Sequence, residues 1–119
     1  MYVVVKTLAD LQDALDRLCG FLEEYEVARD NVFDSKLVVS ELVANALKHS
    51  QAVASFESEV KDGFIRIKVA SSRPFALPEK SVCSDVYAEH GRGLYLVDSV
   101  CESRTTNESG EILVTIKIK

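Results

Sequence analysis

The spacing of apolar residues at the start of the chain predicts a strand followed by a helix. Residues 2–6 form a short β-branched run, YVVVK, which is typical of a strand. Thr7 follows as a helix N-cap, and Asp10 three residues later completes a variant of the capping box. Apolar side chains then recur at intervals of three or four, at Leu8, Leu11, Leu15, Leu18 and Leu22. We therefore expect an amphipathic helix here.

The second helix carries the most informative pattern, SKLVVSELVANALKHS over residues 35–50. At 100° per residue, apolar side chains surround most of the cylinder, as in a buried helix. Glu41, Asn45 and Lys48 fall within about 60° of one another, and Asp34 extends this polar stripe. A buried polar group without a partner costs about 1–3 kcal/mol, so we expect the stripe to face a polar pocket. The alternative is an ordinary solvent-exposed face with a Glu–Lys pair.

The remaining pattern predicts a sheet with helices on one side. The second helix is expected to begin near Asn31 or Asp34 and to end around His49. Strands are expected at residues 53–60 and 64–70, with a turn at 61–63, and a terminal hairpin at 102–106 and 112–118. Residues 71–90 show no period, and a short helix is expected from Gly93 to Cys101. The predicted fold is α+β, a two-layer sandwich with helices on one face of a mixed, mainly antiparallel sheet, in a single domain over residues 1–119.

Composition narrows the class of protein. With 119 residues, 47% hydrophobic and 28% charged, the chain is expected to be globular. Its net charge of −5 argues against a nucleic-acid partner. No apolar run approaches the roughly 20 residues of a membrane span, and the N-terminal residues lack a signal-peptide pattern. We expect a cytoplasmic protein with no membrane partner, in which Cys19, Cys83 and Cys101 are free thiols rather than zinc ligands.

A second chemical signal is the pair of glycines in HGRGLYLV, residues 90–97. Gly91, Arg92 and Gly93 are expected to lie directly before a helix, whose unpaired N–H groups and dipole favour phosphate oxygens. By itself this pattern is more often a tight turn. It is not the dinucleotide-binding fingerprint, because Leu96 occupies the position of the third glycine.

Together, a Glu-x-x-x-Asn helix, a hairpin, an irregular segment and a G-x-G-L helix resemble the GHKL ATPase superfamily. SELVANALKHS is similar to the N-box of that superfamily, and GRGLYLV to its second glycine box. Within it, the chain is most similar to the bacterial serine-kinase anti-sigma factors. The resemblance implies a Bergerat-type, histidine-kinase-like ATPase fold that binds ATP and Mg²⁺. It further implies protein serine/threonine kinase activity, transcription regulation through a sigma factor and an anti-sigma-factor antagonist, and a homodimer as one assembly to test.

The resemblance also implies roles for single residues. Asn45 would coordinate the Mg²⁺ that bridges the triphosphate, and Glu41 would be the base that takes the proton from an attacking hydroxyl. Residues 79–89 would be a lid over ATP. The phosphates would be held by Gly91, Arg92 and Gly93, with Lys48 within reach of one of them.

One part of the family pattern is missing. The family usually has an Asp followed by glycines after the strand expected at residues 64–70, and this Asp reads the adenine amino group. Here the segment is VASSRPF, residues 69–75, without an acidic residue. Ser71 could accept one hydrogen bond from adenine, but without the added strength of a charged acceptor.

Two other functions therefore stay open. One is a non-catalytic protein-binding module of the same fold with degraded adenine recognition. A more distant one is the catalytic domain of a two-component sensor kinase, which the small size of the chain disfavours.

Overall fold

The computed structural model describes residues 1–50, 53–72 and 89–118. In this part of the chain the elements follow the predicted order, with small differences at their ends. Helix α2 begins two residues before Asn31, and helix α3 begins four residues before Gly93. The elements are β1 (Tyr2–Val5), α1 (Leu8–Glu24), α2 (Arg29–Ser50), β2 (Ala54–Lys61), β3 (Phe64–Ser71), α3 (Glu89–Val100), β4 (Ser103–Thr106) and β5 (Ile112–Lys117).

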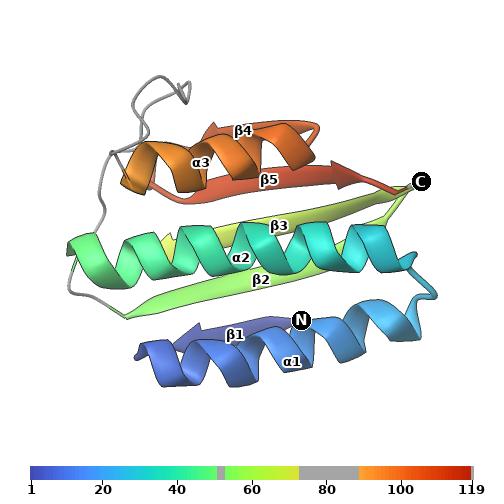
Figure 1. Cartoon of the computed structure of the whole chain (residues 1–119), viewed down its shortest axis with the longest axis horizontal. Coiled ribbons are helices and arrows are strands. Elements are labelled where there is room, and N and C mark those ends of the chain that lie inside the picture. Colours follow the sequence, from blue (N-terminus) through green and yellow to red (C-terminus); the bar gives the residue numbers. More distant parts are fainter. Residues whose placement is uncertain (51–52, 73–88, 119) are drawn as a thin grey trace.

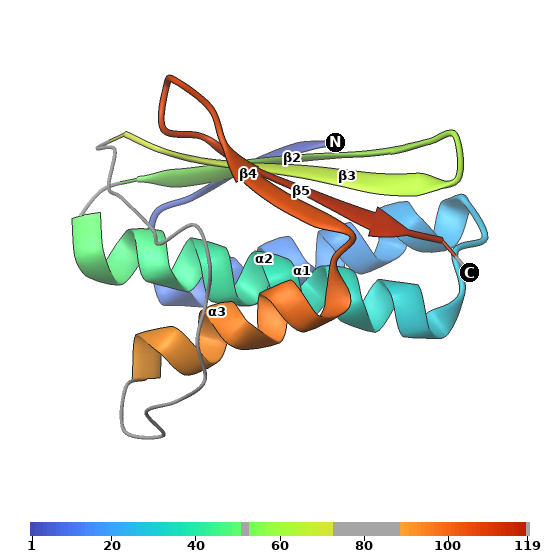
Figure 2. The ribbon, with the colours of Figure 1, turned by 90° about the horizontal axis from the view of Figure 1, so that it is seen from above.

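The five strands form one sheet in the order β1-β2-β3-β5-β4, and each neighbouring pair is antiparallel. The expectation of a mixed sheet is therefore wrong for the described strands. Two of the four pairs, β2–β3 and β4–β5, are hairpins, and a hairpin is antiparallel by construction. The predicted α+β class is confirmed, and the three helices lie side by side on one face of the sheet (Figures 1 and 2). No described helix covers the opposite face (Figure 2).

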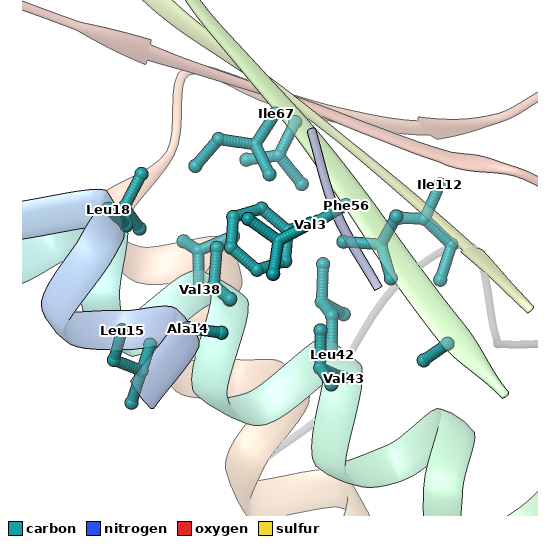
Figure 3. Close-up of a cluster of buried hydrophobic side chains, with 14 of the residues drawn as sticks. Val3, Ala14, Leu15, Leu18, Val38, Leu42, Val43, Phe56, Ile67 and Ile112 are labelled. Atoms are coloured by element: carbon teal, nitrogen blue, oxygen red, sulfur yellow. The ribbon is translucent and has the colours of Figure 1, made fainter. Parts of the chain in front are cut away.

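The core lies between the helix layer and the sheet. Phe56 of β2 is 1% exposed, and its ring points toward α2, where Val38 and Leu42 lie (Figure 3). Val3 of β1 and Leu18 of α1 close the same cluster from their own elements (Figure 3). Along β3 and β5 every second residue is buried, because successive side chains of a strand point to opposite faces.

Local sequence explains where these elements begin and turn. The Thr7 hydroxyl accepts a hydrogen bond from Asp10 N, and an Asp10 carboxylate oxygen accepts one from Thr7 N, so the predicted capping box is confirmed. Asp62 and Gly63 both have positive φ, 55° and 81°, as a two-residue hairpin turn between β2 and β3 requires. Among the described residues, no helix is long and apolar enough to cross a membrane.

Candidate functional site

The polar stripe predicted on α2 runs from the buried side of the helix to solvent. Asn45 is only 8% exposed, Glu41 and Asp34 are half-buried, and Lys48 is exposed. The stripe is thus neither an ordinary solvent face nor part of the apolar core. It borders the core, with the amide as its innermost group.

Helical geometry indicates which neighbour this border faces. Helix α2 lies between α1 and α3, with the sheet behind it (Figures 1 and 2). Its fully buried stripe, which includes Leu42 and Ala46, faces the sheet. In a right-handed helix, the residue immediately before each of these lies 100° away on one flank. Given the direction of α2 in Figure 1, Glu41 and Asn45 therefore lie on the flank toward α3, and the next residue after Leu42, Val43, lies toward α1.

The amide of Asn45 makes no hydrogen bond with any residue that the structure describes, and the carboxylate of Glu41 makes neither a hydrogen bond nor an ion pair there. The Asn45 side chain keeps a small exposed part, so water or a bound ligand can reach its amide. One turn of helix separates the two residues, so their side chains can act on one ligand together. Between them the two side chains carry three acceptor oxygens.

The glycine pair lies inside α3 rather than before it. The helix begins at Glu89, so Gly91 is its third residue and Gly93 its fifth. The prediction that the helix begins at Gly93 is therefore wrong, because it begins four residues earlier. Glycine costs little near a helix end, where tertiary packing decides the boundary. Within the first turn the backbone N–H groups still lack helical partners, so Gly91 contributes an N–H of this kind. The side chain of Arg92 lies outside what the structure describes.

Three chain segments that carry predicted site residues lie at the same end of the molecule. The last turns of α2, the end of β3 and the first turn of α3 lie at the same end in both views (Figures 1 and 2). Helices α2 and α3 also pack directly on each other. The elements that carry Asn45, Ser71 and Gly91 are therefore placed at one end of the fold, although Figure 2 shows the start of α3 on the far side of α2 from the end of β3. Of the expected lid, residues 79–88 lie outside the described residues, and Glu89 is the first residue of α3.

The end of β3 carries no carboxylate. Val69 is 2% exposed and belongs to the core, where it pairs across the sheet with Phe56 and Ile112. Ser71 is half-buried and lies opposite Ala54 at the start of β2. A base-reading group at this position is therefore limited to a neutral hydroxyl.

Mg²⁺ in nucleotide-binding proteins is held mostly by phosphates and water, with only one or two protein ligands. In the described ranges, no three His, Cys, Asp or Glu side chains group as metal ligands. The oxygen of the Asn45 amide is the kind of hard ligand that Mg²⁺ prefers. The residues present at the α2–α3 border thus fit a metal that arrives with a phosphate-bearing ligand.

Other buried polar groups of α2 are structural. Asn31, 1% exposed, donates from its side-chain amide to the carbonyl of Lys117 over 3.0 Å, which ties the start of α2 to β5. Ser35 donates to the carbonyl of Asn31 over 2.8 Å. No sequence pattern indicated these roles, because a buried Asn at a helix start looks like any other polar residue there.

Both thiols that the structure describes are free. The Cys19 thiol donates a hydrogen bond to Glu23 Oε1 over 3.3 Å, and this bond together with partial burial raises its pKa. Burial, followed by the nearby Asp98 carboxylate, raises the pKa of Cys101. Neither thiol is activated as a nucleophile, since activation requires a lowered pKa.

Comparison with known proteins adds no identification. The sequence matches no protein-family model and none of the curated proteins against which it was compared.

Proposed function

We propose that this chain is an ATP- and Mg²⁺-binding regulator of the anti-sigma-factor, protein-serine-kinase type. The observation that carries the proposal is Asn45, an amide that is 8% exposed and has no hydrogen-bond partner among the described residues. A ligand that coordinates or hydrogen-bonds at this amide would supply the partner that the described residues do not. The motif resemblance of residues 40–50 and 91–97 supports ATP with its metal as that ligand.

The roles of the residues follow from their chemistry. Asn45 would hold Mg²⁺ through its amide oxygen, and the metal would neutralise charge on the triphosphate. The N–H groups of the first turn of α3 would bind phosphate oxygens, with the helix dipole adding to their attraction. Glu41, half-buried and without an ion pair in the described part, is available to accept a proton from a serine or threonine hydroxyl of a protein substrate.

A second candidate is a protein-binding module of the same architecture that does not turn over ATP. The observation that favours it is the end of β3, where Val69 is committed to the core and Ser71 offers only a hydroxyl. Without a carboxylate to accept from the adenine amino group, base affinity is reduced. This candidate keeps the fold and the partner surfaces while losing productive nucleotide binding.

Calorimetric titration with ATP, in the presence and absence of Mg²⁺, distinguishes the two candidates. We expect wild type to bind ATP with an affinity that Mg²⁺ increases, and Asn45→Ala to lose that increase. Glu41→Gln should retain binding, because its proposed role is in proton transfer. Ser40→Ala is the matched control, since Ser40 is a half-buried polar residue on α2 outside the stripe.

The possible results of the titration distinguish the two candidates and test the metal site. Absence of ATP binding by folded wild-type protein would favour the non-catalytic module. Equal Mg²⁺-dependent binding by wild type and Asn45→Ala would show that the metal site lies elsewhere. Circular dichroism of each variant shows whether it is folded before its binding is interpreted.

A further inference from the structure

A hollow of about 440 Å³ lies where α1 ends and α2 begins. The turn between these helices is at the opposite end of the helix layer from the last turns of α2 (Figure 1). Phe33, which lines the hollow, precedes Asn45 by twelve residues, about 18 Å along the helix axis. The hollow is therefore separate from the candidate nucleotide site. Its volume is within the range of small-molecule sites, roughly 300–1,000 Å³.

A hydrogen-bonded turn holds Val27 in the wall of this hollow. Val27 N donates to Leu22 O over 3.2 Å, and Glu26 N donates to Glu23 O over 2.9 Å, which are the two bonds of a Schellman motif. Glu26 has a φ of 57°, the left-handed conformation that the motif requires at this position. Because backbone bonds fix the turn, the hollow is formed without a ligand, and binding does not have to order it.

The apolar part of the hollow is open to solvent. Phe33 is 67% exposed, whereas Val32 beside it belongs to the core. A ring exposed to this extent contributes little to the stability of the fold. A second ring placed against it would remove apolar surface of both from water, and paired aromatic rings attract each other further. The hollow thus offers an aromatic surface that α1 and α2 leave uncovered.

Two cations border this apolar surface. Among the described residues, neither Arg29 nor Lys36 forms an ion pair. Glu23 is the carboxylate that also lines the hollow, and it accepts a hydrogen bond from the Cys19 thiol over 3.3 Å. Two cations and one carboxylate leave a net charge of +1, beside a helix that is acidic overall. One carboxylate on a ligand balances this charge, whereas a phosphate dianion would place excess negative charge next to Glu23.

We propose that this hollow binds a small aromatic monocarboxylate, with its carboxylate between Arg29 and Lys36 and its ring against Phe33. Arg29 and Phe33 are four residues apart on α2, so their side chains lie on the same face of the helix and reach one ligand together. Arginine donates to a carboxylate through two parallel N–H bonds, which favours a planar acid over other anions. The ligand is thus recognised by one charge and one ring.

Nuclear magnetic resonance titration of the full chain with hydrocinnamate tests the proposal, with hydrocinnamamide as its neutral isostere. We expect binding of the acid in the millimolar range, because the hollow is open and the ligand is small. The shifted backbone amides should lie within residues 19–36. The neutral amide should bind at least about tenfold more weakly, because it lacks the charge that Arg29 and Lys36 attract.

Substitutions separate the two parts of the site. Arg29→Gln and Lys36→Gln should each weaken binding of the acid about three- to fivefold and leave the amide unchanged. Phe33→Ala should weaken binding of both compounds, and it should fold because this ring is largely exposed. The matched controls are Arg17→Gln on α1 and Tyr95→Ala on α3, an exposed cation and an exposed ring outside the hollow. Both controls should bind like wild type.

Cys19 gives an independent measurement, because its thiol lines the hollow. Bound hydrocinnamate should slow the reaction of Cys19 with iodoacetamide and leave the rate at Cys101 unchanged. Equal slowing at both thiols would mean that the compound acts on the protein as a whole, which contradicts a site at the hollow.

The proposal is overturned if wild type binds neither compound, or if folded Arg29→Gln and Lys36→Gln both bind the acid like wild type. Shifts centred on Asn45 would place the site elsewhere and would also contradict it. Tighter binding of inorganic phosphate than of hydrocinnamate, at the same residues, would show an anion site that does not recognise the ring. None of these measurements uses ATP, so their outcome is independent of the proposed function.

Discussion

Arg104 on β4 and Asp98 on α3 form a two-bonded ion pair that fastens the last helix to the edge of the sheet. Arg104 Nε lies 2.6 Å from Asp98 Oδ1, and Arg104 Nη2 lies 3.1 Å from Asp98 Oδ2. The arginine side chain is 4% exposed and the aspartate 28%. Because α3 packs on α2 and carries the glycine pair in its first turns, this ion pair fixes the helix that brings the glycines to α2.

Breaking this ion pair should strongly destabilise the fold. Asp98→Asn removes the carboxylate charge that a nearly buried guanidinium faces, and we expect the free energy of unfolding to fall by about 3 kcal/mol. The matched control is Glu59→Gln, which removes the Glu59–Arg66 pair on the sheet surface, where both side chains are about half exposed and 3.7 Å apart. That variant should lose no more than about 0.5 kcal/mol. Urea denaturation of both variants measures the difference, and equal losses would show that Asp98 does not anchor α3.

The same substitution should have opposite effects at two glycines. Gly63 has a φ of +81°, in the region that L-residues rarely adopt, and a methyl group there would meet nothing within 4 Å. Gly63→Ala should therefore cost about 1 kcal/mol of stability from backbone strain alone. Gly20 lies within α1, exposed, and also has open space around it. Gly20→Ala should stabilise the protein by about 0.5–1 kcal/mol, because alanine restricts the unfolded chain and favours helix.

Thermal unfolding of these two variants beside wild type shows whether each substitution stabilises or destabilises the protein. A stabilised Gly63→Ala would mean that the β2–β3 turn adopts another conformation in solution. A destabilised Gly20→Ala would mean that the exposed side of α1 is covered by something at this residue.

The architecture was predictable because short-range patterns determine most of it. Three local patterns each specify one element, and the structure has all three: the spacing of leucines in α1, the Thr7–Asp10 capping box and the Asp62-Gly63 turn. The prediction that the sheet includes parallel strands was wrong, because strand direction depends on how chain segments return across the helix layer. Helix α3 begins earlier than predicted because glycines near a helix end do not by themselves set its boundary.

The candidate site was only partly predictable for the same reason. The stripe of Glu41 and Asn45 follows from helical periodicity, which is local. The exposed fraction of each side chain depends on how α2 packs against α3 and the sheet. The sequence therefore did not show that Asn45 is 8% exposed while Lys48 is exposed. The Arg104–Asp98 pair and the bond from Asn31 to Lys117 join elements that no sequence pattern connects.

The two described cysteines should react slowly with alkylating reagents at neutral pH. The thiolate is the reactive form, and the pKa of both thiols is raised, at Cys19 first by its hydrogen bond to Glu23 and at Cys101 first by burial. Cys101 is also half-buried, which limits access of the reagent. Peptide-resolved mass spectrometry after iodoacetamide treatment should show both modified more slowly than the same residues in urea-unfolded protein. Glu23→Gln should speed modification of Cys19 and leave Cys101 unchanged, and the absence of this difference would contradict the role of Glu23.

Nucleotide recognition should be permissive if this chain binds nucleotide at the α2–α3 border. Val69 lies in the core and Ser71 is a neutral residue, so no carboxylate at the end of β3 can select the adenine amino group over the guanine carbonyl. We expect ATP and GTP to bind with similar, modest affinity, since one missing charge-assisted hydrogen bond is worth about 1.5–3 kcal/mol of selectivity.

Ser71→Asp tests the position by gain of function. It should strengthen ATP binding by about tenfold or more relative to GTP, whereas Ser72→Asp, one residue further along and exposed, should leave the ratio unchanged. Competition titrations with both nucleotides measure that ratio. Strong preference of wild type for ATP would mean that another group reads the base, and an unchanged ratio in a folded Ser71→Asp variant would move the base site away from the end of β3.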